Sequence, residues 1–133
     1  MKKYENFCRA LENLKDIYEY EEPYNNVILT GLVALYEICF EQSWKLMKEL
    51  LEKEGVTEAR TGSPRQILKS AYQAGMVREE TLWMDALAAR NNVAHAYNQA
   101  VALDIVSQTK KRYYPMFAAL KTTIEENWKE QEQ

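Results

Sequence analysis

Apolar residues recur at spacings of three and four along most of the chain, a pattern typical of amphipathic helices. The first helix is expected to run from Tyr4 to about Tyr20. It ends before Pro23, because a proline disfavours helix in the residue before it. The apolar stripe of this helix consists of Tyr4, Phe7, Cys8, Leu11, Leu14 and Tyr18.

The second predicted helix begins at the capping residues Asn25 and Asn26 and reaches Glu54, where Gly55 permits the left-handed conformation that ends a helix. It carries two adjacent apolar stripes. One consists of Ile28, Leu32, Leu35, Cys39, Leu46 and Leu50, and the other of Leu29, Val33, Tyr36, Phe40, Trp44, Met47 and Leu51. We interpret the surplus apolar width as a subunit interface, with a fully intramolecular core as the alternative. Glu41 and Lys45 form a four-residue pair that we assign to a solvated face.

Two shorter helices are predicted next. Residues 56–62 are expected to form a loop, after which Ser63-Pro64-Arg65-Gln66 combines a capping serine, a first-turn proline and a glutamine that can complete a capping box. Gly75 closes this helix. A fourth helical segment is predicted to begin at Arg78 and to continue into residues 90–97. Its side chains expected to face the core are Leu82, Trp83, Ala86 and Leu87.

The final helix is predicted to start near Asn98 and to kink near residues 113–114, because Pro115 costs about 3 kcal/mol inside a helix. The apolar stripe resumes in phase beyond the proline, so we expect one bent helix, followed by a charged tail, 129–133, that frays. Together these elements predict an all-α fold. We expect an up-and-down four-helix bundle with the third helix broken into shorter segments, in a single domain over residues 1–133.

Composition supports a globular helical chain. Of the 133 residues, 47% are hydrophobic and 28% charged, and only four are glycine and three proline, too few for strand-and-turn architectures. The net charge of −3 argues against a general nucleic-acid coat, but leaves room for a small basic cleft. Lys110-Lys111-Arg112 is the only compact basic run, and it fits either a solvated helix face or a surface that steers RNA.

Cysteine usage and hydropathy limit which metal sites and membrane segments are expected in the chain. Cys8 and Cys39 lie on apolar stripes and are interpreted as reduced core thiols, with a disulfide or a metal site as the alternative. One histidine and two distant cysteines cannot supply the four ligands of a structural zinc site without carboxylates. We therefore expect no metal and no cofactor.

The most apolar run, 27–40, is interrupted by Glu37 and is shorter than the roughly 20 residues of a membrane span. With no signal-peptide pattern at the start, a cytoplasmic location without membrane association is expected.

Residues 90–97, Arg-Asn-Asn-Val-Ala-His-Ala-Tyr, hold the only histidine in the chain. On an unbroken helix Arg90 and Tyr97 share a face, whereas His95 lies about 140° away from Arg90 around the axis. Arg90 and His95 therefore converge only if the helix breaks between them or if a second copy supplies one of them. Asn91-Asn92 is a suitable break, since asparagine readily ends helices.

These residue types suit phosphate chemistry. The arginine fork matches a phosphate, histidine exchanges a proton near neutral pH, and tyrosine offers a hydroxyl and a stacking face. They are typical of metal-independent RNA cleavage, with Asn91 in support. Each residue also has an interpretation without chemistry: His95 as a surface histidine, Arg90 as a partner of the helix dipole, and Tyr97 as core. Spacing alone does not establish an enzyme.

The spacing Arg90-x-x-x-x-His95-x-Tyr97 resembles the motif of the HEPN superfamily. More narrowly, the chain resembles the bacterial and archaeal nucleotidyltransferase substrate-binding protein family. The further landmarks, in order, are Phe40-Glu41-x-x-Trp44-Lys45, Ser63-Pro64-Arg65, Ala74-Gly75, Leu82-Trp83 and Tyr114-Pro115. They cover the chain from about residue 4 to 125. Ala94 departs from the pattern, since relatives often carry Ser or Thr there, which puts a supporting hydrogen bond in doubt.

The resemblance implies a HEPN-like bundle that forms a homodimer, with motif residues of both chains lining one cleft. It also implies a partner, a minimal nucleotidyltransferase encoded by an adjacent gene. In such toxin–antitoxin modules the HEPN protein cleaves RNA, and the partner silences it by transferring AMP to the motif tyrosine, here Tyr97. Other members are described only as the substrate- or nucleotide-binding half of the pair.

Three hypotheses follow. The first is a metal-independent ribonuclease that uses Arg90 and His95, with Asn91 in support. The second is a non-catalytic subunit that presents a nucleotide or other substrate to a separate nucleotidyltransferase. The third is a helical dimer in which residues 90–97 are merely the end of a helix.

Overall fold

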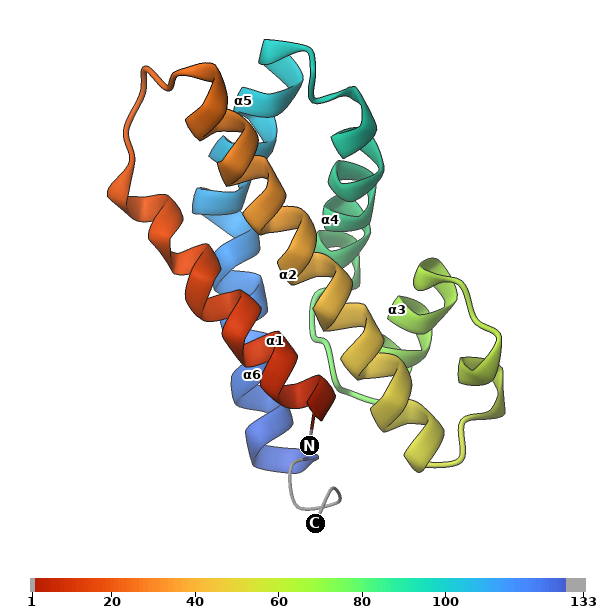
Figure 1. The fold of residues 1–133 in the computed structure, drawn as a ribbon. Helices are drawn as coiled ribbons and strands as arrows, with labels where there is room; N and C mark the ends of the chain where they lie inside the picture. Colours follow the sequence, from red (N-terminus) through yellow and green to blue (C-terminus); the bar gives the residue numbers. More distant parts are fainter. Residues whose placement is uncertain (1, 129–133) are drawn as a thin grey trace.

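The computed structural model describes residues 2–128 and is all-helical over that range. Figure 1 shows long helices that run alternately up and down, with α3 set to one side of α2. The α-helices are α1 (Lys2–Leu14), α2 (Asn26–Lys53), α3 (Pro64–Gln73), α4 (Glu80–Asn92), α5 (Gln99–Gln108) and α6 (Tyr114–Asn127). The predicted bundle is confirmed: α3 and α4 are the pieces of the broken third helix, and α5 with α6 forms the fourth.

Short helical turns extend or join these helices. The first helix continues from Leu14 to Glu19 as a 3₁₀ turn, η1 (Lys15–Glu19), close to the predicted end. The predicted loop 56–62 contains a 3₁₀ turn as well, η2 (Thr57–Arg60). This difference has a packing reason, because the turn buries Ala59 against the core. The predicted fraying of residues 129–133 lies outside the described residues.

Helix α2 is the centre of the bundle and contacts α1, α3, α4 and α5. Both of its apolar stripes are buried or half-buried within one chain; only Ile28, Leu35 and Trp44 are half-buried. The interpretation of the second stripe as a subunit interface is therefore wrong. A helix surrounded by neighbours on several sides uses a wide apolar face for its own core.

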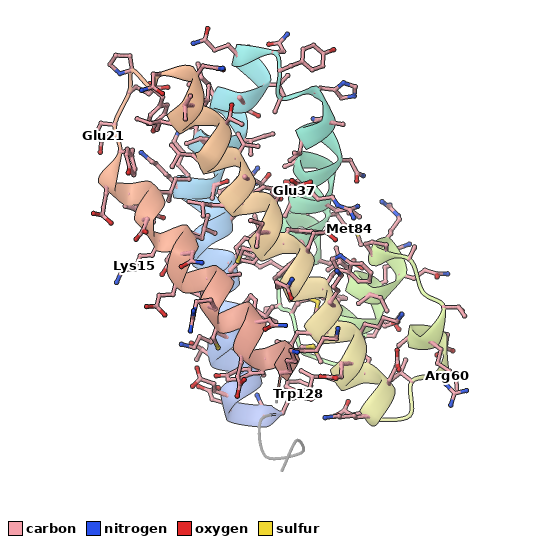
Figure 2. The ribbon with its side chains drawn as sticks, in the orientation of Figure 1. Lys15, Glu21, Glu37, Arg60, Met84 and Trp128 are labelled. Atoms are coloured by element: carbon pink, nitrogen blue, oxygen red, sulfur yellow. The ribbon has the colours of Figure 1, made fainter. Side chains whose placement is uncertain are left out.

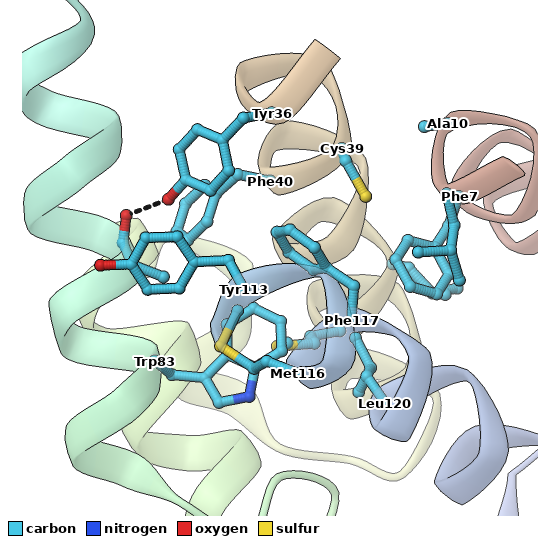
Figure 3. Close-up of a cluster of buried hydrophobic side chains, with 14 of the residues drawn as sticks. Phe7, Ala10, Tyr36, Cys39, Phe40, Trp83, Tyr113, Met116, Phe117 and Leu120 are labelled. Carbon is cyan, nitrogen blue, oxygen red and sulfur yellow. Dashed lines mark hydrogen bonds between the residues drawn. The ribbon is translucent and has the colours of Figure 1, made fainter. Parts of the chain in front are cut away.

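Aromatic rings from three helices form the middle of the core (Figure 3). The ring of Phe117 on α6 lies 6.1 Å from that of Tyr36 on α2 and 5.5 Å, edge to face, from that of Trp83 on α4. Phe40 lies 6.2 Å from Trp83. The hydroxyl of Tyr36 donates to the backbone carbonyl of Ala86. These contacts fix α4 against α2 one turn before Arg90.

The predicted helix ends are present. Ser63 Oγ accepts from Gln66 N at 3.3 Å and Gln66 Oε1 accepts from Ser63 N at 3.3 Å, which completes the capping box that starts α3. Gly55 and Gly75 follow the C-caps of α2 and α3 at φ of 83° and 79°, the left-handed region that favours glycine.

Pro115 is accommodated by a π-helical turn, η4 (Thr109–Tyr113), between α5 and α6. A proline lacks the N–H that would donate within an α-helix, and wider turns of this kind absorb such a defect. The predicted single bent helix is thus continuous from α5 to α6, with its irregularity slightly before the predicted position. Tyr18 Oη donates to the Lys110 carbonyl at 2.6 Å, so one carbonyl of the irregular turn has a partner.

Other predictions concern thiols and membranes. Cys8 and Cys39 are both free, as expected of reduced core thiols, and burial raises the pKa of the Cys39 thiol. Between residues 2 and 128, no helix is long and apolar enough to cross a membrane.

Candidate functional site

Residues 90–97 lie at the end of the bundle where α4 turns into α5, beside the connection between α1 and α2 (Figure 1). The predicted break between Arg90 and His95 is present. Helix α4 ends at Asn92, and a 3₁₀ turn, η3 (Val93–His95), follows. Asn98 then caps α5, because its Oδ1 accepts from the backbone N–H groups of Ala100 at 2.9 Å and Val101 at 3.4 Å.

Arg90 is held by a carboxylate on α2. Its Nε donates to Glu41 Oε1 at 2.6 Å, and its Nη1 donates to Asn91 Oδ1 at 3.2 Å. The other carboxylate oxygen, Glu41 Oε2, accepts from Trp44 Nε1 at 3.1 Å. The side chains of Arg90 and Glu41 are 28% and 25% exposed, and a partly exposed ion pair contributes about 1 kcal/mol or less to stability. Its main effect is on the orientation of the guanidinium.

This pairing corrects the assignment of Glu41 to a solvated face, because Glu41 pairs with Arg90, whereas Lys45 is exposed as predicted. Sequence analysis did not place Glu41 in the site, although Phe40-Glu41-x-x-Trp44-Lys45 was among the landmarks of the resemblance. Residues three apart lie on the same side of a helix, so the spacing of Glu41 and Trp44 was the available signal.

His95 and Tyr97 are both exposed. The centroids of their rings lie 6.4 Å apart, and the ring planes are at 65° to one another. Tyr97 is 88% exposed, so the interpretation of Tyr97 as a core residue is wrong. Within the described residues, Arg90 and His95 share no hydrogen bond or ion pair. Convergence of Arg90 and His95 on one ligand stays a prediction.

A small cavity borders this end of the bundle, and a larger groove lies elsewhere, between α4 and α6. A small one of about 220 Å³ is lined by Tyr97, Ala96, Gln99 and the start of α2, and is smaller than the roughly 300 Å³ at which small-molecule pockets begin. A groove of about 940 Å³ between α4 and α6 contains none of the four predicted site residues. Between residues 2 and 128, no group of three or more His, Cys, Asp or Glu side chains could hold a metal ion.

The side chains of the basic run on the π-helical turn have different partners. Lys110 Nζ donates to the Tyr20 carbonyl at 2.6 Å and to Tyr24 Oη at 2.9 Å. Arg112 points to α4 instead, where its Nη1 donates to Asp85 Oδ2 at 3.0 Å, a hydrogen bond that raises the pKa of the guanidinium. Lys111 and Arg112 are exposed, so the interpretation as a solvated face fits both, whereas Lys110 is half-buried. The interpretation as a surface that steers RNA stays a prediction.

Comparison with known proteins decides the family. The model of the family described as nucleotidyltransferase substrate binding protein like matches residues 2–126. The chain belongs to this family. Membership confirms the resemblance, drawn from the sequence, to the nucleotidyltransferase substrate-binding family of the HEPN superfamily.

Two relatives of this family member are informative. A probable ribonuclease, HepT of Haemophilus influenzae, is 25% identical over 85 residues, which cover 62% of the chain and 58% of the relative. The match thus spans less than two thirds of that protein's length. A crystal structure of a protein from Thermus thermophilus superposes with a TM-score of 0.72 at 26% identity, covering 92% of this chain and 98% of that one. The bundle is therefore shared over nearly its whole length.

Proposed function

We propose that this family member is the HEPN-type half of a two-gene toxin–antitoxin-like module, a metal-independent ribonuclease silenced by a minimal nucleotidyltransferase. The observation that carries the proposal is the end of the bundle formed by residues 90–97. There, Arg90 is fixed by Glu41, while His95 and Tyr97 stay open to a ligand. Replacement of His95 tests the cleavage step, and replacement of Tyr97 tests the silencing step.

Cleavage uses the proton chemistry of His95 and the charge of Arg90. The imidazole accepts the proton of an RNA 2′-hydroxyl, the 2′-oxygen attacks the adjacent phosphorus, and the bond from phosphorus to the 5′-oxygen breaks. The products are a 2′,3′-cyclic phosphate and a 5′-hydroxyl, whose proton comes from an imidazolium or from water. Arg90 and Asn91 stabilise the charge that develops on the phosphate oxygens.

In this proposal a second copy of the chain completes the site. The outward side of α2 offers a pairing face, which we define as Val27, Gly31, Ala34 and Ile38. Val27 is 80% and Ile38 51% exposed, and a Cβ placed on Gly31 meets nothing within 4 Å. Exposed apolar side chains gathered on one face are typical of interfaces. Ile38 lies one turn before Glu41, so this pairing face borders the site.

Replacing Ile38 with aspartate is expected to separate the copies. A carboxylate buried in the pairing face without a partner costs about 3 kcal/mol or more, which weakens the dimer by more than about a hundredfold. Analytical ultracentrifugation over a range of concentrations measures this change. Tyr72→Asp is the matched control, because Tyr72 is also exposed but lies on α3, away from the pairing face. A wild-type chain that stays monomeric throughout, or a dimer unaffected by Ile38→Asp, contradicts the proposal.

Silencing acts on Tyr97. Its phenol oxygen attacks the α-phosphorus of ATP, pyrophosphate leaves, and the phenol proton passes to a base of the transferase. The 88% exposure of Tyr97, in the turn after η3, lets a second protein reach the hydroxyl without unfolding a helix.

Replacing Tyr97 with phenylalanine is expected to abolish modification completely, because only the hydroxyl is removed. Intact mass spectrometry of the chain co-expressed with the nucleotidyltransferase of the adjacent gene should show one or more AMP units on the wild type and none on Tyr97→Phe. Tyr72→Phe, which removes another exposed hydroxyl, should still be modified. Equal AMP content in all three proteins would exclude Tyr97 as the acceptor.

One observation favours the alternative, a non-catalytic nucleotide- or substrate-binding subunit of a two-component nucleotidyltransferase. The positive charge of Arg90 is paired with Glu41 in this conformation, which lowers its attraction for a phosphate. A chain that co-purifies with the transferase and binds nucleotide, yet leaves RNA intact in the absence of the partner, would establish this alternative.

A further inference from the structure

Two side chains of α2 control the orientation of Arg90. Trp44 Nε1 donates to Glu41 Oε2 at 3.1 Å, and Arg90 Nε donates to Glu41 Oε1 at 2.6 Å. Both oxygens of the carboxylate are therefore engaged, one from its own helix and one from α4. A carboxylate with a hydrogen bond at each oxygen has little freedom to rotate. The Nε side of the Arg90 guanidinium is therefore held toward α2.

Within the described residues, the hydrogen bonds of Arg90 engage two of its N–H donors. A guanidinium has five N–H donors. The Nε–H is taken by Glu41, and one N–H of Nη1 is taken by Asn91 Oδ1 at 3.2 Å. The three other donors are one N–H of Nη1 and two of Nη2, and parallel N–H groups of a guanidinium match two oxygens of a phosphate.

We propose that Glu41, oriented by Trp44, is a positioning residue that presents the Nη edge of Arg90 to the scissile phosphate. The inference rests on the proposed function for the identity of that phosphate as RNA. The same geometry assigns Asn91 a divided role: its Oδ1 holds Nη1 of Arg90, and its Nδ2 remains a donor for the ligand.

Because Glu41 is negatively charged, a role in positioning Arg90 can be distinguished from a role in RNA affinity. A carboxylate beside Arg90 repels an incoming phosphate, so its presence weakens binding of RNA in the ground state. Its benefit arises in the transition state, where the donors must already point at the oxygens that gain charge. Loss of Glu41 should therefore lower kcat without raising KM, a pattern that a residue serving only the fold does not produce.

The kinetic test uses Glu41→Ala and Glu41→Gln with a fluorescent mixed-sequence single-stranded RNA. Glu41→Ala should lower kcat about tenfold or more, with KM unchanged or smaller. Glu41→Gln should recover part of kcat, because its amide oxygen still accepts from Arg90 Nε. Trp44→Phe, which keeps a ring but removes the N–H, should fall between wild type and Glu41→Ala.

The matched control is Glu37→Gln, because Glu37 lies one turn earlier on α2 (Figure 2) and is likewise half-buried, but forms no ion pair within the described residues. It should keep the wild-type kcat. A kcat of Glu41→Ala equal to that of the wild type, or a KM that rises with kcat unchanged, would overturn the positioning role.

A second measurement does not depend on cleavage. The Nε–H resonance of Arg90, assigned by its loss in Arg90→Lys, should exchange with solvent at least about tenfold faster in Glu41→Ala than in the wild type or in Glu37→Gln. Equal exchange rates in all three proteins would overturn the inference. If the wild type cleaves no RNA, the ribonuclease proposal fails, while the exchange rates still decide whether Glu41 orients Arg90.

Discussion

Replacing His95 with alanine is expected to lower the rate of RNA cleavage by about a hundred- to ten-thousandfold, the usual contribution of a positioned proton acceptor. The reason is local, because His95 is the only histidine in the chain, so no second imidazole can take over. Its ring is exposed, with its centroid 6.4 Å from that of the Tyr97 ring, so the variant should keep the fold. Single-turnover cleavage of a fluorescent RNA, with circular dichroism as a check of folding, measures the effect.

The matched control is Asn92→Ser, an exposed position three residues earlier that takes no part in the proposed site. It should cleave RNA at the wild-type rate. Cleavage by the His95 variant within a factor of two or so of the control would remove the imidazole from the mechanism and would favour the non-catalytic alternative.

Replacing Phe117 with alanine is expected to destabilise the chain by about 3–5 kcal/mol, the largest effect on stability that we predict. Its side chain is fully buried, and its ring packs against those of Tyr36 and Trp83 at the centre of the core (Figure 3). Truncation leaves a cavity between α2, α4 and α6 that the surrounding rings cannot fill without leaving their rotamers. Urea denaturation at one fixed chain concentration measures the loss, since association also stabilises the folded state.

Tyr72→Ala serves as the comparison, because this aromatic side chain is exposed on α3 and its truncation should cost about 1 kcal/mol or less. The same core also places the site, since Tyr36 links α2 to α4 one turn before Arg90. Burial raises the pKa of the Tyr36 phenol, so it stays protonated and keeps donating to Ala86 at any pH at which RNA is stable. A Phe117 variant as stable as the Tyr72 variant would show that these rings do not carry the core.

The fold was largely predictable because helix periodicity and end signals act locally. The capping box at Ser63, the glycine after each of α2 and α3, and the break at Asn92 each depend on residues within one turn of one another. The stripe of the last helix also predicted its continuation past Pro115. Periodicity did not show how many neighbours surround a helix, which is why the two stripes of α2 were interpreted as a core and an interface.

The sequence by itself determined the helices, their order, the family and the placement of an arginine, a histidine and a tyrosine within eight residues. Only the tertiary structure decided what these residues touch. Glu41 and Arg90 are 49 positions apart, and their ion pair exists because the packing of α4 on α2 brings them to 2.6 Å. Likewise, Lys110 and Arg112 are neighbours in sequence but point to different elements. Spacing along a helix fixes the direction of a side chain, whereas its partner depends on which helix packs there.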